Sequence, residues 1–255
     1  MGKGGREIVM KQFPENIKFK YDWRKYQQRV LEQLNEKLVD NHLHIVAPPG
    51  SGKTVLGLEV ALRINKPTLV FAPTIAIRNQ WIQRFTELFL QISSPPDWIS
   101  RDIRNPQFLT VVTYQSLHAV LANDIEKTSE LDEENDLEEE IIKESKIDTS
   151  KFDQLIQLYK KKNIGTIIID EAHHLKNSWW KSLNLFKNEI QATIVGLTAT
   201  PPYDVSYQEW QRYIELNGSI DLEITIPELI EEGDLCPHQD LIHCSQPTIA
   251  EIQKI

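Results

Sequence analysis

The chain has 255 residues, 40% of them hydrophobic, which is enough for one large packed domain or two small ones. Its apolar runs are shorter than the ~18 residues of a membrane span, and its N-terminal residues lack the apolar stretch of a secretory signal. Its two cysteines give no disulfide framework. We therefore expect a cytoplasmic (intracellular) protein with no membrane partner. The net charge is −9 (28 basic minus 37 acidic side chains), and it arises wholly in residues 124–148, which contain three basic and twelve acidic side chains. Because the rest of the chain is neutral overall, the net charge neither supports nor excludes a polyanionic partner.

Short apolar runs, which predict buried strands, alternate along the chain with helically spaced apolar residues. In chain order we predict a helix over 25–39, a strand over 43–47, a helix over 53–64, a strand over 67–73, helix 75–89, strand 108–114, helices 116–122 and 152–162, and strands 166–170 and 192–200. This order predicts an α/β fold in three layers, with a mostly parallel central sheet covered by helices on both faces. The polar residues that close the strands then lie along one edge, where such folds bind ligands.

The acidic stretch, with its flanks 123–150, interrupts this alternation. Its dense like charge and lack of aromatic residues predict a solvated, flexible insertion. A strip that mimics nucleic acid and inhibits the protein is the alternative interpretation.

Residues 47–54, APPGSGKT, lie between a predicted strand and a predicted helix. They match the phosphate-loop pattern G-x-x-x-x-G-K-[ST], except that Ala47 replaces the first glycine. Small residues let the backbone wrap a phosphate, and the N–H groups at the start of the helix point toward it. We expect Lys53 to reach the β- and γ-phosphates and Thr54 to bind Mg²⁺. The predicted nucleotide contacts are Pro49, Gly50, Ser51, Gly52, Lys53 and Thr54.

Residues 166–174, TIIIDEAHH, combine a β-branched strand with acidic residues at its end. Asp170 then lies at the sheet edge, where it can hold Mg²⁺ together with Thr54. Glu171 is placed to orient or deprotonate an attacking water. An Asp-Glu pair after a strand is often only a helix start, and the phosphate loop upstream makes the metal interpretation the stronger one.

DEAH (170–173), APPGSGKT and the downstream TAT (198–200) resemble motifs II, I and III of superfamily 2 helicases. The resemblance implies a RecA-like phosphate-loop fold that hydrolyses ATP with Mg²⁺. It also implies that His173 couples the nucleotide site to motif III, formed by Thr198, Ala199 and Thr200.

Other segments resemble further elements of that family. WRKYQQ (23–28) is similar to the adenine-recognising element, which implies ATP contacts for Arg24 and Gln27; a merely solvated glutamine is the alternative. FAPTIAIRNQW (71–81) and VVTYQSL (111–117) resemble motifs Ia and Ib, which imply nucleic-acid contacts for Thr74, Arg78, Thr113 and Tyr114. Helix capping, with Trp81 in the core, is the alternative there.

GLTATPP and IPELIEEGDLCP are similar to the branch that contains XPB-like DNA translocases and the motor subunits of type I and type III restriction enzymes. This favours double-stranded DNA over RNA, with an RNA helicase or an ATP-switched clamp as alternatives, and an assembly platform as a third. The resemblance implies a leader over 1–20, an ATP-binding domain over 21–244 and a linker over 245–255. A second RecA-like domain would lie elsewhere in the full-length protein or in a partner subunit, so we expect weak ATP hydrolysis by this chain alone.

Two features are predicted to have structural roles only. Cys236, His238, His243 and Cys244 match no usual zinc spacing, and the sequence there predicts a strand. Trp179 and Trp180 follow the DEAH loop at helical spacing and are expected to pack in the core.

Overall fold

The computed structural model describes residues 10–122, 149–174 and 177–237. In these residues one seven-stranded sheet has the order β3-β4-β2-β5-β6-β1-β7, and every neighbouring pair is parallel. The predicted α/β fold with a parallel sheet is confirmed. Because the strands run the same way, their carboxyl ends meet at one edge of the sheet.

The predicted helices and strands occur in the predicted order along the chain. The strands are β1 (His42–Val46), β2 (Thr68–Ala72), β3 (Ile99–Ser100), β4 (Leu109–Thr113), β5 (Thr166–Asp170), β6 (Thr193–Thr198) and β7 (Leu222–Glu223). The α-helices are α1 (Lys25–Lys37), α2 (Lys53–Ile64), α3 (Ile75–Arg84), α4 (Tyr114–Ala122), α5 (Thr149–Lys161), α6 (Asn177–Glu189), α7 (Tyr207–Asn217) and α8 (Ile226–Glu231). The described residues also form two 3₁₀ turns, η1 (Leu38–Asp40) and η4 (Ala172–His174), and one π-helical turn, η2 (Phe85–Leu90).

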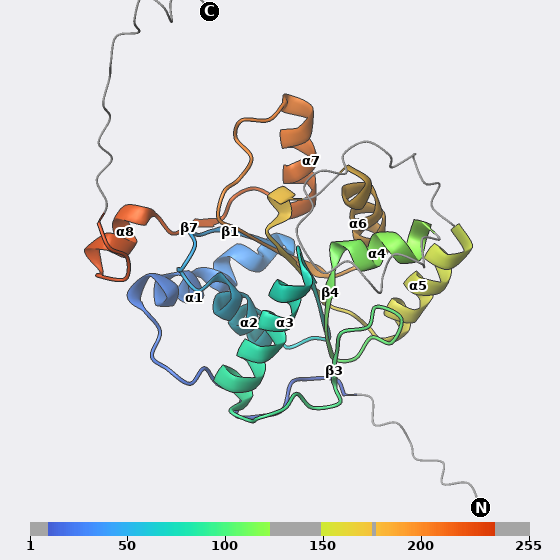
Figure 1. Ribbon diagram of the computed structural model, residues 1–255, viewed down its shortest axis with the longest axis horizontal. Helices are drawn as coiled ribbons and strands as arrows, with labels where there is room; N and C mark the ends of the chain where they lie inside the picture. Colours follow the sequence, from blue (N-terminus) through green and yellow to red (C-terminus); the bar gives the residue numbers. More distant parts are fainter. Residues whose placement is uncertain (1–9, 123–148, 175–176, 238–255) are drawn as a thin grey trace, which may run out of the picture.

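The helices cover both faces of the sheet, with α1, α2 and α3 on one side and α4, α5 and α6 on the other (Figure 1). Alternate strand residues divide between two apolar clusters. In β5, Ile168 packs with α2 and α3, whereas Ile167 and Ile169 pack with α4, α5 and α6. This period of two sends the next side chain, Asp170, to the α2–α3 face. No helix of the described residues is both long and apolar enough to cross a membrane.

The structure has several elements that were not predicted: the helices α6, α7 and α8 and the edge strands β3 and β7. The edge strands β3 and β7 have two residues each, too few to form a sequence pattern. The predicted helix over 75–89 is divided, because the Thr86 hydroxyl donates to the Ile82 carbonyl where α3 gives way to the π turn.

The expected leader over 1–20 is also not separate from the domain. Phe13 is buried in an aromatic cluster with Phe85, Trp98 and Phe108, and its N–H donates to Asn65. Part of the expected leader therefore packs on the domain, and the boundary at residue 20 stays a prediction. The insertion 123–148 and the linker 245–255 lie outside the described residues, as do His238, His243 and Cys244.

Gly57 provides a test of the packing between α2 and α3. A Cβ at this position would lie 2.6 Å from Cη2 of Trp81 and 2.7 Å from Cδ1 of Leu197. We expect Gly57→Ala to lower the free energy of unfolding by roughly 1–2 kcal/mol, because overpacking outweighs the helix propensity of alanine. Urea denaturation measures this change. A gain in stability would show that the core relaxes around the methyl group.

Candidate functional site

Three polar loops meet at the carboxyl edge because β6 lies between β1 and β5. Val46 pairs with Thr198, and Asp170 pairs with Leu197. Main-chain bonds extend both ladders into the loops: Ala47 N donates to Thr198 O at 2.9 Å, and Glu171 N donates to Leu197 O at 2.7 Å. The segments 47–54, 170–174 and 198–200 are therefore side by side.

The phosphate loop has the conformation that its glycines permit. Gly50 and Gly52 have φ angles of 84° and 85°, in the left-handed region, and Gly52 immediately precedes α2. A Cβ on Gly52 would also lie 2.6 Å from Nε2 of Gln27. Both the backbone conformation and the lack of space therefore disfavour a side chain at this position. The Ser51 hydroxyl is one of four buried side-chain atoms without a hydrogen-bond partner among the described residues. A loop with these features fits a phosphate group.

Gln27 lies beneath this loop. Its Nε2 donates to Ser51 O at 2.9 Å, its Oε1 accepts from Arg24 N, and the Tyr26 hydroxyl also donates to Ser51 O. Arg24 in turn contacts the Tyr26 hydroxyl at 2.8 Å and Asp234 at 3.2 Å. The alternative of a solvated Gln27 is wrong, because this side chain is buried. Its contact with adenine stays a prediction.

Asp170 is a buried carboxylate at the end of β5, with an exposed fraction of 4%. The indole N–H of Trp81 donates to its Oδ2 at 2.7 Å. Burial, with a smaller contribution from the charge of Glu171, raises the pKa of this carboxyl to about 6, although the Trp81 hydrogen bond and the charges of Lys53 and Arg84 act in the opposite direction. Lys53, the residue before Thr54, is close enough to lower the pKa of Asp170, and the Thr54 side chain is buried at the start of α2. A carboxylate and a hydroxyl are oxygen donors of the kind that Mg²⁺ prefers. The residues therefore fit a metal–nucleotide complex.

Glu171 joins all three loops. Its Oε1 lies 3.2 Å from Nζ of Lys53, and its Oε2 accepts from Ala199 N at 3.0 Å. Lys53 also donates to Ala47 O at 3.1 Å. The φ angle of Glu171 is 54°, a left-handed conformation that is unfavourable for a residue with a Cβ by about 1 kcal/mol. Backbone strain at a candidate site is consistent with a functional constraint on this carboxylate.

His173 contacts both threonines of 198–200, as the resemblance implied. Its Nδ1 lies 2.8 Å from Oγ1 of Thr198, and its Nε2 lies 3.2 Å from Oγ1 of Thr200. The DEAH turn is thereby joined to motif III by side chains as well as by backbone. The coupling role of these contacts stays a prediction.

A family model described as "Type III restriction enzyme, res subunit" matches residues 20–203. The chain belongs to this family. The fold is that of a superfamily 2 RecA-like domain, in agreement with the resemblance to the branch of XPB-like and restriction-enzyme motors.

Two curated relatives are similar to this res-family chain. The DNA 3'-5' translocase XPB2 of Sulfurisphaera tokodaii is 27% identical over 84% of the chain and 38% of its own length. A putative ATP-dependent RNA helicase of African swine fever virus is 25% identical over 69% of the chain and 28% of its own length. The chain thus spans between about a quarter and two fifths of these relatives.

Two solved structures show the same fold. The UvsW helicase of bacteriophage T4 superposes with a TM-score of 0.53 at 14% identity, over 84% of the chain and 64% of that protein. The Hef helicase domain of Pyrococcus furiosus superposes with a TM-score of 0.52 at 19% identity, over 82% of the chain and 39% of that protein. At these identities the likeness concerns the fold alone.

The residues predicted to contact nucleic acid divide into two pairs. Thr74 is exposed and caps α3 by accepting from Ile77 N, and Arg78 is half-buried one turn later. Thr113 and Tyr114 are buried, with exposed fractions of 5% and 2%.

The side chain of Tyr114 is engaged in contacts within the protein. Its ring lies in the core between Phe71 and Trp179, and its hydroxyl donates to Asp170 O at 2.7 Å. The hydroxyl of Thr113 is bonded to Ser116 and accepts from Ser116 N at the start of α4, so it serves as a cap. Helix capping and core packing account for both side chains in this structure, and their contact with nucleic acid stays a prediction.

Trp81 lies in the core, as the alternative interpretation of its segment had it, but its bond to Asp170 was not predicted. A buried indole N–H needs an acceptor, and that need was the available signal. Trp179 and Trp180 pack beside the second apolar cluster, as predicted, and the Trp180 indole donates to Arg212 O.

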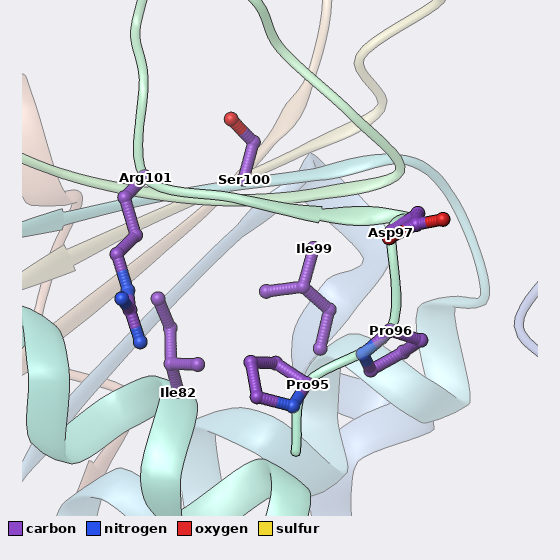
Figure 2. Close-up of a pocket in the computed structure, with 7 residues that line it drawn as sticks. All are labelled: Ile82, Pro95, Pro96, Asp97, Ile99, Ser100 and Arg101. Atoms are coloured by element: carbon purple, nitrogen blue, oxygen red, sulfur yellow. The ribbon is translucent and has the colours of Figure 1, made fainter.

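A hollow of about 350 Å³ lies beside α3, between Ile82 and the segment that contains β3 (Figure 2). Arg101 extends along Ile82, whereas the carboxylate of Asp97 points away from the hollow. Arg78 of α3 lies one turn before Ile82. Burial, and to a smaller extent the positive charge of Arg101, lowers the pKa of the Arg78 guanidinium group. The charge of Arg101 therefore acts on the guanidinium group of Arg78.

The raised pKa of Asp170 gives a pH-dependent prediction for the nucleotide-free protein. Between its ordinary value of 3.8 and about 6, the folded chain binds a proton that the unfolded chain has released. The contribution of this group to the free energy of unfolding therefore falls as pH rises through that window and stays low above it. We expect Asp170→Asn to be more stable than the wild type by roughly 1–3 kcal/mol above pH 6, at about 1.4 kcal/mol per pKa unit, and equal to it near pH 4. Thermal unfolding over that pH range measures the difference, and a constant difference would contradict the raised pKa.

Proposed function

We propose that this chain is the ATP-binding motor domain of a superfamily 2 helicase or translocase that acts on double-stranded DNA. The main support is the convergence of Lys53, Glu171 and motif III within hydrogen-bond distance at one sheet edge. Lysine, carboxylate and backbone N–H groups in that arrangement are suited to phosphoryl transfer to water. The matched family and the translocase relative agree with this chemistry.

In the proposed site, the N–H groups of Gly50 to Thr54 surround the β- and γ-phosphates of ATP, and Thr54 and Asp170 hold Mg²⁺. When bound, Mg²⁺ neutralises the charge that develops on the phosphate oxygens. Lys53 leaves its contact with Glu171 to bind a phosphate, because a doubly ionised phosphate attracts the ammonium more strongly than one carboxylate does. Glu171, freed of Lys53, then orients the attacking water and accepts its proton.

Motif III would sense this change through two contacts. Glu171 accepts from Ala199 N, and His173 lies against Thr198 and Thr200. A movement of the Glu171 carboxylate toward water therefore alters the bonding of 198–200. We propose that this segment transmits the state of the nucleotide to a second RecA-like domain, located in the full-length protein or in a partner subunit. The greater length of the relatives supports such a partner, and hydrolysis by the chain alone would be weak.

Nucleic acid would contact the start of α3, where Thr74 is exposed and Arg78 and Arg101 approach each other. Two neighbouring guanidinium groups favour a phosphate backbone and give no base specificity. The similarity to a DNA translocase supports DNA. The similarity to a putative viral RNA helicase supports RNA as the second candidate.

The assignment is tested with Lys53→Ala and Glu171→Gln in the full-length protein. Both variants should lower nucleic-acid-stimulated ATP hydrolysis by about 10²-fold or more, because each loses a group that acts on the transition state. Lys53→Ala should also weaken ATP binding, whereas Glu171→Gln should retain it. Lys37→Ala, at the far end of α1, is the control and should behave as the wild type. Stimulated hydrolysis that survives in both variants would reject the proposal.

The phosphate contact is tested with Arg101→Ala. Loss of one phosphate contact should weaken DNA binding severalfold at about 0.1 M salt and reduce the slope of log K against log salt by about 0.9. Fluorescence anisotropy with a DNA duplex measures both, and Lys37→Ala again controls for the loss of one positive charge. An unchanged slope would exclude Arg101 from the contact. The same titration with an RNA duplex distinguishes the two candidate substrates.

A further inference from the structure

Asp170 is fixed from both faces of the sheet by aromatic hydrogen-bond donors. The Trp81 indole donates to its Oδ2, and the Tyr114 hydroxyl donates to its main-chain carbonyl, each at 2.7 Å. Both donors are buried, so water does not compete for these bonds. One bond orients the carboxylate and the other fixes the backbone from which it extends.

The two donors come from the segments that resemble motifs Ia and Ib. Trp81 is in α3, two turns after Thr74 and one turn after Arg78, and Tyr114 is the first residue of α4. α3 covers one face of the sheet and α4 covers the other. Each segment therefore reaches the same aspartate through a single side chain.

Both aromatic rings are tightly packed. The Trp81 ring lies against Gly57 of α2, where even a methyl group would be too close. The Tyr114 ring is stacked near Phe71 and Trp179, with interplanar angles of 8° and 20°. Because neither ring has room to rotate, a shift of α3 or α4 moves its donor atom as well.

We propose that Trp81 and Tyr114 are positioning residues that orient Asp170 for Mg²⁺ and transmit contacts at α3 and α4 to the metal site. The χ2 torsion of an aspartate is broad, and the indole bond at Oδ2 selects one orientation in which Oδ1 stays available to the metal. The transmission part rests on the proposed function, since it requires nucleic acid to contact α3 or α4. The positioning part requires only that the site binds Mg²⁺ with a nucleotide.

Trp81→Phe tests the positioning part, because it retains an aromatic ring and removes the N–H donor. Binding of a non-hydrolysable ATP analogue to the full-length protein is measured by calorimetry across a Mg²⁺ titration and in EDTA. The Mg²⁺ concentration at half-saturation should rise about three- to tenfold, the equivalent of one hydrogen bond, while binding in EDTA stays unchanged. A merely structural role would alter both conditions alike.

Trp98→Phe is the matched control, because Trp98 packs with Phe13, Phe85 and Phe108 away from the nucleotide loops. It should leave the Mg²⁺ dependence unchanged, whatever its effect on thermal stability. Tyr114→Phe removes only the hydroxyl and should shift the Mg²⁺ dependence in the same direction, so it decides the matter if Trp81→Phe does not fold. Mg²⁺ dependence equal to that of Trp98→Phe in every folded variant would overturn the proposal.

A second arm adds a DNA duplex to the same titration. In the wild type, DNA should increase the affinity for the Mg²⁺–analogue complex, and by linkage the complex should increase the affinity for DNA by the same factor. Trp81→Phe and Tyr114→Phe should both reduce that factor. A factor as large as in the wild type would reject the transmission of contacts from α3 and α4 to the metal site. A wild-type protein that binds neither DNA nor RNA would contradict the proposed function, while the nucleic-acid-free arm would still decide the positioning role.

Discussion

The backbone pairing of β6 between β1 and β5 is the constraint on which the site depends. Parallel ladders on both sides bring Thr198 level with Val46 and Leu197 level with Asp170. The loops that follow are therefore adjacent at their first residues. Short loops suffice, and the functional side chains lie on rigid strand ends instead of mobile excursions.

Charge at this edge is balanced locally in the absence of a nucleotide. Lys53 is close to the Glu171 carboxylate and to the Ala47 carbonyl, while the indole of Trp81 donates to the Asp170 carboxylate and offsets part of the cost of its burial. The group proposed to activate water is therefore paired with the group proposed to bind phosphate. In the proposed mechanism this pairing keeps Glu171 from acting until a phosphate replaces it at Lys53.

The sequence predicted the central strands and the loops well because their signals are local. Short, mostly apolar runs placed β1, β2, β4, β5 and β6 within two residues of their bounds, and the helix from Lys53 to Ile64 was predicted correctly. The loop motifs then located the site, since parallel strands leave one edge on which polar ends can meet. The contacts of His173 with Thr198 and Thr200 followed from the family resemblance alone.

What the sequence did not predict depends on contacts between distant residues. Trp81 and Tyr114 are 89 and 56 residues from Asp170, and no local pattern specifies which acceptor a buried donor will reach. The same limit explains why Tyr114 was assigned to a nucleic-acid surface and Phe13 to a leader, although both are in the core.

The contact of the Trp81 ring with Gly57 has an evolutionary consequence. Positions 57 and 81 divide a fixed volume between α2 and α3, so a side chain at position 57 would require a smaller ring or none at position 81. Loss of the indole would in turn leave a buried carboxylate without its donor. Homologues should therefore vary at these two positions together or not at all, and pairwise covariation in an alignment would trace the path between the two helices.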